Sequence, residues 1–155
     1  MKYANISVWL ADLTYTNFQT NMLGSDTFPL AIGCIATYAE SKIPLTHPIR
    51  LFRYPEKIAA ALEEGTPHIM GFSNFVWNSE LALAFARRLK EINPTIITVM
   101  GGPHYPIERS KQETFLRSHP EIELYVVHEG EVEIVALLNA LIESGLHKKR
   151  IGAGT

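Results

Sequence analysis

Short runs of β-branched and aromatic residues alternate with longer helical patterns along the whole chain, and this rhythm limits the fold more than any other feature. The expected strands lie at 5–13, 48–54, 67–73, 95–102 and 122–130, and the expected helices at 28–42, 55–65, 78–94, 107–120 and 131–145. Five strand–helix units favour an α/β fold in which helices cover both faces of a parallel sheet. The continuous apolar runs at 67–73 and 95–102 are typical of central strands.

Composition is consistent with one globular domain. The chain has 155 residues, of which 46% are apolar and 19% charged, with a net charge of −2. That charge argues against a broad basic surface for nucleic acid, and the basic stretch HKKR at 147–150 reads first as a solvated helix end. No run approaches the ~20 apolar residues of a membrane span. The N-terminus is a poor signal peptide, so we expect a cytoplasmic protein with no membrane partner.

Two helices carry a prediction about which side faces the core. In 28–42, Leu30, Cys34, Ala36 and Tyr38 recur near helical spacing, and Cys34, the single cysteine, is expected to be buried. In 78–94, the expected inward stripe consists of Leu81, Ala84, Phe85 and Leu89. One cysteine cannot form a disulfide within the chain or hold an iron–sulfur cluster.

Candidate binding residues follow the strands, because ligands of open α/β sheets bind outside the carboxyl ends of the strands. The loop after the first strand is long and polar, which in a compact domain usually indicates function. The third strand ends in SNFVWNS, with Phe75 and Trp77, the fourth in GGPHYP, and the fifth in HEGEVE. The pair Gly101-Gly102 either forms a tight turn or lets a ligand approach the backbone.

Two longer stretches carry a family resemblance. The sequences GFSNFVWNSELALAFARRLKEINPTIITVMGGPHYP and ELYVVHEGEVEIVALLNAL, with PLAIGCIATYAES upstream, resemble the N-terminal cobalamin-binding domain of cobalamin-dependent radical S-adenosylmethionine enzymes. The resemblance implies a flavodoxin-like three-layer sandwich with strand order 2-1-3-4-5. It also implies that cobalamin (vitamin B12) lies at the carboxyl edge, with its nucleotide tail in a slot between the sheet and a helix face.

The resemblance also implies a set of cofactor-binding residues. Gly101 and Gly102 would let the tail pass, Ser73 and Asn74 would offer polar contacts, and Gly130 would let the fifth loop pack under the ligand. The complete expected set is Asp12, Thr14, Tyr15, Thr16, Asn17, Ser73, Asn74, Phe75, Trp77, Gly101, Gly102, Pro103, His104, His128, Glu129 and Gly130. For His104, contact with the corrin and simple solvation stay open. No catalytic residue is expected.

Two departures from related domains shape the expectation. The first loop lacks the Asp-x-His-x-x-Gly motif with which many cobalamin carriers supply a histidine beneath cobalt, and no histidine occurs before Ile43. The Cys-x-x-x-Cys-x-x-Cys motif of radical enzymes is also missing. We therefore expect a cobalamin-binding domain at 1–146 and a tail at 147–155 that begins a linker. The iron–sulfur cluster, S-adenosylmethionine and the radical or methyltransferase chemistry would belong to a following domain, so this chain alone would not be catalytic.

Two other functions stay open on the sequence. An FMN- or nucleotide-binding flavodoxin-like protein would hold phosphate in a Gly/Ser/Thr-rich first loop at a helix N-terminus, and this loop is polar but has no compact glycine cradle. A vestigial scaffold domain would fill the tail slot with bulky side chains. A metal site at His128, Glu129 and Glu131 is not expected, because carboxylates at a helix start usually serve the helix dipole.

Overall fold

A computed structural model describes residues 4–14 and 28–146, and this part of the chain forms one parallel sheet flanked by helices. The strand order is β2-β1-β3-β4-β5, which confirms the flavodoxin-like topology expected from the sequence. The strands are β1 (Val8–Ala11), β2 (Arg50–Phe52), β3 (Ile69–Ser73), β4 (Ile97–Gly101) and β5 (Leu124–Val126). The helices are α1 (Leu30–Lys42), α2 (Pro55–Glu64), α3 (Ser79–Ile92), α4 (Arg109–Ser118) and α5 (Gly130–Glu143).

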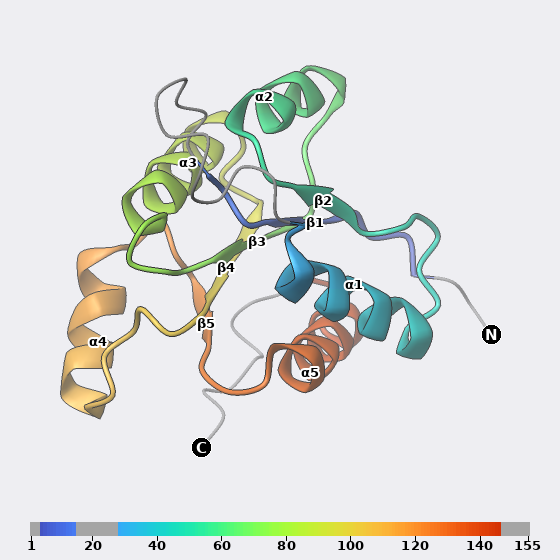
Figure 1. Ribbon diagram of the computed structural model, residues 1–155. Helices are drawn as coiled ribbons and strands as arrows, with labels where there is room; N and C mark the ends of the chain where they lie inside the picture. Colours follow the sequence, from blue (N-terminus) through green and yellow to red (C-terminus); the bar gives the residue numbers. More distant parts are fainter. Residues whose placement is uncertain (1–3, 15–27, 147–155) are drawn as a thin grey trace.

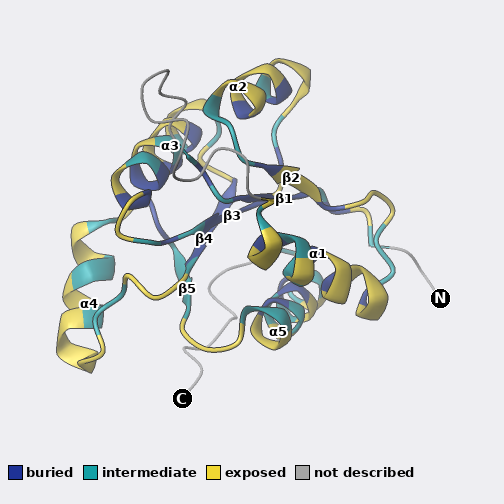
Figure 2. Ribbon diagram, viewed as in Figure 1, coloured by how far each residue is buried: buried dark blue, intermediate teal, exposed yellow. Residues whose placement is uncertain are grey.

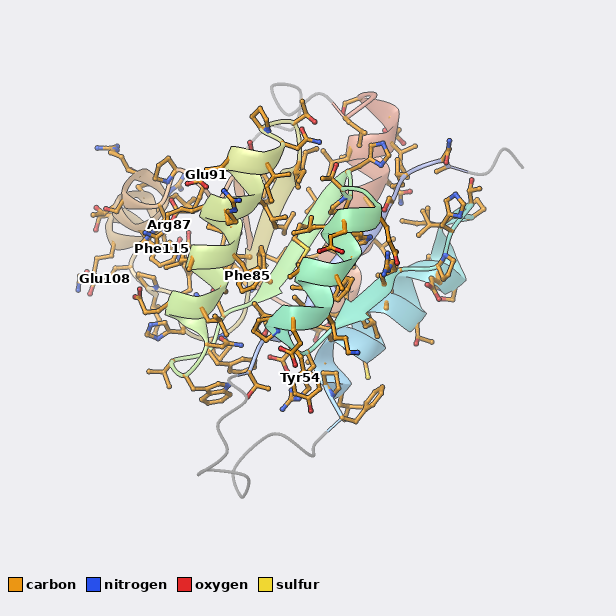
Figure 3. All side chains as sticks on the ribbon, turned by 90° about the horizontal axis from the view of Figure 1, so that it is seen from above. Tyr54, Phe85, Arg87, Glu91, Glu108 and Phe115 are labelled. Atoms are coloured by element: carbon orange, nitrogen blue, oxygen red, sulfur yellow. The ribbon has the colours of Figure 1, made fainter. Side chains whose placement is uncertain are left out.

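The helices form two layers, one on each face of the sheet (Figure 1). α1 and α5 pack side by side on one face, where Leu138 and Leu141 are fully buried. α2 and α3 cover the other face. At the β5 side of that face, Phe115 and Leu116 of α4 pack against the same core. Figure 3 shows this second layer from above, with Phe85 and Arg87 on α3 and Phe115 on the neighbouring α4.

The two central strands are buried on both sides, as their continuous apolar runs predicted. β5 at the sheet edge is half-buried and α4 contributes no fully buried residue, so burial declines toward that side (Figure 2). No helix among the described residues is long and apolar enough to span a bilayer.

Local signals explain where several helices begin and end. Pro55 occupies the first turn of α2, where its missing N–H costs nothing, and Gly65 follows the last turn. Gly145 ends α5 with a φ of 64°, a left-handed conformation that favours glycine. Asn78 lies at the N-cap of α3, but its side-chain oxygen accepts from the N–H of Phe75 rather than from the helix.

The predicted inward faces of α1 and α3 were partly wrong. Of the expected residues only Ala36 is buried, together with Ile32 and Ala39, whereas Cys34, Leu30 and Tyr38 are exposed. α1 is apolar all round, so its periodicity did not distinguish the inner stripe from the outer one.

On α3, Ala84 is exposed, whereas Ala82, Leu83 and Ala86 are buried with Leu89. Leu81 and Phe85 lie at the margin of the core. The small side chains of Ala82 and Ala86 let the helix lie close to the sheet, so the buried face combines these alanines with Leu83 and Leu89.

Candidate cofactor-binding site

A cleft of about 220 Å³ opens at the carboxyl edge of the sheet, between the strands and the α1–α5 layer. Four strands and both helices contribute to its walls. The lining residues are Leu10, Ala31, Ile32, Ile35, Gly71, Phe72, Ser73, Phe75, Val99, Met100, Gly101, Gly102, Val126, His128, Gly130, Glu131 and Ile134. The cleft therefore lies between sheet and helix face, at the edge where ligands of this fold class bind.

The cleft exists because side chains on this face shrink toward the carboxyl edge. Along β3 the residues facing α1 and α5 run from Ile69 through Gly71 to Ser73, since alternate residues of a strand share a face. On β4 the equivalent positions run from Ile97 to Gly101, and Ser73 pairs in register with Gly101. The space left by these small residues is partly taken by Leu10, whose Cδ2 lies 2.6 Å from where a Cβ on Gly71 would be.

The two glycines that end β4 have different roles. Gly102 has a φ of 136°, and a Cβ there would lie 2.6 Å from the backbone oxygen of Asn74, so the turn itself requires glycine. A Cβ on Gly101 would meet Val126 at an ordinary 3.4 Å. No atom of the described residues forbids a small side chain at Gly101, and its absence leaves room in the cleft.

Asn74, fully buried at the end of β3, holds the GGPHY loop in place. Its backbone N–H donates to Gly101 O at 2.7 Å, and its carbonyl accepts from the N–H of His104 at 3.1 Å. The side-chain Nδ2 donates to His104 O at 2.6 Å and to the Tyr125 hydroxyl at 2.9 Å. Its Oδ1 is buried without a hydrogen-bond partner among the described residues. Asn74 thus fixes the loop through its backbone and its side chain together.

Tyr125 of β5 supports the same loop from below. Its hydroxyl donates to Gly102 O at 2.8 Å, and its ring stacks on Tyr105 with centroids 3.6 Å apart. Phe115 meets both rings edge-on. Burial of the hydroxyl raises the pKa of Tyr125 to about 12, so the phenol stays protonated and able to donate at neutral pH.

Asp12, at the end of β1, joins the carboxyl ends of three strands. Its Oδ1 accepts from Ser73 Oγ at 2.6 Å and from Asn78 Nδ2 at 3.2 Å, while its Oδ2 pairs with Arg53 at 3.0 Å. Thr14 continues this connection, because its N–H donates to Arg53 O. These contacts hold the start of the first loop against β2 and β3.

Phe75 and Trp77 form an aromatic pair beside the cleft. Their rings are stacked with centroids 4.6 Å apart and an interplanar angle of 6°. Phe75 lines the cleft, whereas Trp77 is 65% exposed. The pair therefore presents a flat apolar surface to solvent at the carboxyl edge.

The loop after β5 forms the opposite rim of the cleft. A Cβ on Gly130 would lie 2.7 Å from Ile35 Cδ1, so this glycine lets α5 begin close to α1. His128 is exposed at the rim, and Glu129, also exposed, is the N-cap residue of α5. Glu131 and Glu133 in the first turn suit the helix dipole. Within 4–14 and 28–146, no three His, Cys, Asp or Glu side chains are grouped as metal ligands.

The structure brings together six residues of the expected set as cleft lining: Ser73, Phe75, Gly101, Gly102, His128 and Gly130. Asp12, Thr14, Asn74, Trp77, Pro103, His104 and Glu129 lie outside the lining, and Pro103 and His104 are exposed. Tyr15, Thr16 and Asn17 lie outside the described residues.

The expected set missed the apolar walls of the cleft, from Leu10 and Ile32 to Val99 and Ile134. Gly71 was the available signal, since a glycine inside a buried strand often marks a close approach of another group.

Fold and cleft together define a flavodoxin-like domain with an open cleft at the carboxyl edge of its sheet. The sequence model of the B12 binding domain family matches residues 20–138 of the chain. The chain belongs to this family, which confirms both the resemblance and cobalamin as the cofactor.

Two curated relatives are similar to the chain. A 2-(S-pantetheinyl)-carbapenam-3-carboxylate methyltransferase from Streptantibioticus cattleyicolor is 31% identical in an alignment over 116 residues that covers 71% of this chain and 16% of the relative. The cobalamin-dependent radical SAM methyltransferase TokK from Streptomyces tokunonensis is 30% identical with the same coverage. The chain thus spans about a sixth of the length of either relative, that is 16%.

The residues of the cleft fit a cobalamin tail. The cleft has a volume of about 220 Å³, which is below the roughly 300–1,000 Å³ of pockets that enclose a whole small ligand. It therefore suits one part of a larger ligand. The scaffold alternative predicted bulky side chains in this slot, and the described residues leave it open.

Proposed function

We propose that residues 1–146 are the cobalamin-holding module of a radical S-adenosylmethionine enzyme of the methyltransferase type, and that residues 147–155 begin a connection to the radical domain. The observation that carries the proposal is the cleft between the sheet and α1–α5, in a chain of the B12 binding domain family. The two relatives, both methyltransferases by name, support the methyltransferase assignment.

In this proposal the nucleotide tail enters the cleft along Gly101, Ser73 and Gly130. Gly101 is the central contact, because it leaves space that the fold itself does not need. His128 at the rim and Asn74, through the GGPHY loop that it holds, shape the entrance. Gly102, Pro103 and His104 turn the chain beneath the corrin, with Asp12, Thr14 and Glu129 around it. The cofactor contacts expected of Tyr15, Thr16 and Asn17 stay a prediction.

We further propose that no histidine of this chain binds cobalt from below. In this proposal the stacked apolar rings of Phe75 and Trp77, rather than an imidazole, face the lower side of the cobalt. When bound, cobalamin supplies a cobalt centre able to carry a methyl group, and the chain supplies binding, orientation and shielding of the lower face.

The radical chemistry itself is assigned to a following domain that holds the iron–sulfur cluster and S-adenosylmethionine. This chain then binds cofactor without catalysing a reaction. A cytoplasmic location accompanies the proposal, because a cysteine-held cluster is best kept in a compartment that keeps thiols reduced.

The test is retention of cofactor by the purified chain. Hydroxocobalamin is added in excess, free cofactor is removed by gel filtration, and the visible spectrum of the protein fraction is recorded. Stoichiometric cobalamin is expected, and a parallel incubation with FMN should leave no flavin. Retention of FMN and not of cobalamin would reverse the assignment.

A cleft-filling variant sharpens this test. Gly101→Leu should weaken retention by about fivefold to a hundredfold, because overpacking the slot costs about 1–3 kcal/mol. Ala136→Leu, which adds the same side chain to an exposed position of α5, is the matched control and should retain cofactor normally. Equal retention by both variants would show that the tail does not use the cleft.

The proposal that no histidine binds cobalt from below is tested separately, by electron paramagnetic resonance of the bound cob(II)alamin. Its spectrum should lack the splitting produced by an axial nitrogen, and His104→Ala and His128→Ala should leave it unchanged. Nitrogen splitting that disappears in either variant would identify that histidine as a ligand.

A further inference from the structure

We propose that the cleft selects corrinoids by the base of their nucleotide tail, favouring an apolar benzimidazole base over adenine. This inference rests on the proposed function and deepens it, because it states which chemical class of cobalamin-like cofactor the site accepts. It comes from the chemistry of the cleft walls rather than from the presence of the cleft.

The walls are apolar where the cleft is deepest. Leu10, Ile32, Val99 and Ile134 are each at most 5% exposed, and all four line the cleft. Partly buried Ile35 and Val126, with the side-chain-free Gly71, complete this apolar section.

The polar lining residues have little to offer a buried base. Ser73 Oγ already donates to Asp12 Oδ1 and accepts from Asn78 Nδ2. His128 is exposed, and Glu131 is only partly buried in the first turn of α5, so both can meet solvent.

The backbone at the carboxyl ends of β3 and β4 is also engaged. Gly101 O accepts from the Asn74 N–H and Gly102 O from the Tyr125 hydroxyl, while β3 and β4 bond to each other in register from Ile69 to Gly101. Among the described residues, the deep section therefore presents no polar side chain to a ligand edge.

The two bases make different demands on such a surface. A dimethylbenzimidazole edge carries methyl groups and buries apolar area at no polar cost. An adenine edge carries an amino group and ring nitrogens that lose water. Polar groups left without a partner lose binding free energy, so we expect cobalamin to be retained roughly tenfold to a hundredfold more tightly than its adenine analogue, which corresponds to about 1.4–2.8 kcal/mol.

The experiment compares three corrinoids on the 155-residue chain: hydroxocobalamin, the analogue with adenine as the lower base, and cobinamide, which has no nucleotide. Dissociation constants are obtained from visible spectra of the bound corrinoid. The expected order is cobalamin tightest, the adenine analogue weaker, and cobinamide distinctly weaker than cobalamin.

The outcomes separate this inference from the proposed function. Equal affinity for the cobalamin and adenine forms would overturn selectivity while leaving cobalamin binding intact. Cobinamide bound as tightly as cobalamin would also overturn it, because the cleft would then hold no tail. No retention of any corrinoid would instead refute the proposed function and this inference with it.

A pair of isosteric variants tests the physical cause. Val99→Thr places a hydroxyl in the apolar wall and should reduce the preference for cobalamin over the adenine analogue by several fold. Val8→Thr makes the same change at a buried position of the same core cluster that does not line the cleft. It should leave the preference unchanged, and thermal unfolding of both variants controls for folding. An unchanged preference in Val99→Thr would refute the apolar wall as its cause.

Discussion

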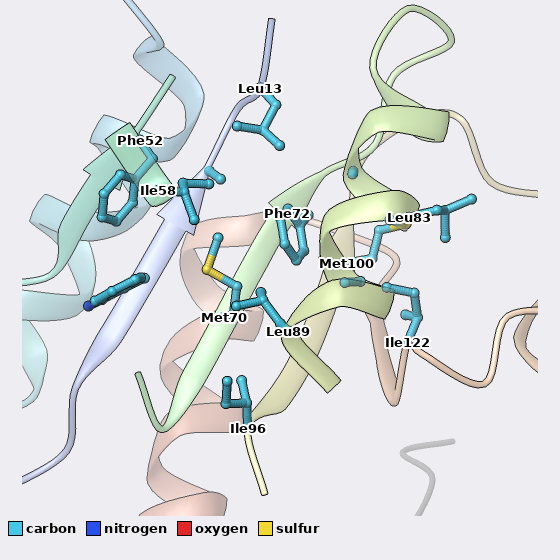
Figure 4. Close-up of a cluster of buried hydrophobic side chains, with 14 of the residues drawn as sticks. Leu13, Phe52, Ile58, Met70, Phe72, Leu83, Leu89, Ile96, Met100 and Ile122 are labelled. Carbon is cyan, nitrogen blue, oxygen red and sulfur yellow. The ribbon is translucent and has the colours of Figure 1, made fainter. Parts of the chain in front are cut away.

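The two faces of the sheet are built from alternate residues of the same strands, yet only one is filled to the carboxyl edge. On the α2–α3 face, Trp9, Phe52, Met70, Phe72 and Met100 form a continuous core (Figure 4). On the α1–α5 face, large residues occur at the amino end of the strands and glycines at the carboxyl end, where the cleft opens.

This difference divides two tasks between the faces. The filled face gains stability from aromatic and methionine packing, and Trp9 and Phe52 are in tilted contact with centroids 5.0 Å apart. The tapered face gives up packing at one end and thereby leaves room for a flat ligand group. A sheet can hold a cofactor without weakening its whole core, because the two faces are packed independently.

The test with the largest expected effect compares two truncations at adjacent residues of β1. Trp9→Ala should lower the free energy of unfolding by about 3–5 kcal/mol, because it leaves a cavity in the filled face. Leu10→Ala, on the tapered face, should cost about 2 kcal/mol, the low end for such a change, because part of this side chain already borders open space. Urea unfolding monitored by circular dichroism measures both. Equal losses would show that the faces are equally packed.

The next test separates the two glycines at the end of β4. Gly102→Ala should cost about 2–3 kcal/mol, because the residue would keep a positive φ and its Cβ would meet the backbone of Asn74. Gly101→Ala should cost less than about 1 kcal/mol, since its Cβ finds ordinary contacts. Melting temperatures of the apo chains check this order, and the reverse order would contradict the assignment of Gly102 to the turn.

These glycines also show how far the sequence could be interpreted. The pair stood out because a buried strand ended on two residues without side chains, and both explanations considered for it, turn and ligand approach, find support in different members of the pair. The alternation of strands and helices predicted the parallel sheet with helices on both faces, and the family resemblance implied the strand order 2-1-3-4-5; both are confirmed.

The orientation of helices and the supports of the site were harder to predict. α1 is apolar on every side, so its pattern placed Cys34 inward although it lies outward. No sequence pattern marked Tyr125 as a support of the site, because this role depends on its contact with Asn74, 51 residues away. In the sequence, Leu10 and Ile134 have the pattern of ordinary core residues. They line a cleft only because the neighbouring strand positions carry small residues.

The last test concerns Tyr125, which links the filled face to the loop that borders the cleft. Tyr125→Phe removes the hydroxyl between Asn74 and Gly102 and should cost about 1 kcal/mol at neutral pH, the usual net value of one hydrogen bond. Tyr105 and Phe115 still pack on the ring, so most of the aromatic contact remains.

The pH dependence of this variant distinguishes the hydrogen bond from packing. The pKa of Tyr125 is raised from 10.0 to about 12 by burial in the folded chain, so the unfolded chain loses this proton first as the pH rises. The contribution of the hydroxyl is therefore complete below pH 10 and is lost progressively between pH 10 and about 12. Urea unfolding of wild type and Tyr125→Phe at pH 8, 10 and 11 should show the difference between them narrowing. A constant difference would mean that the hydroxyl acts only through its volume, and that the loop beside the cleft does not depend on its proton.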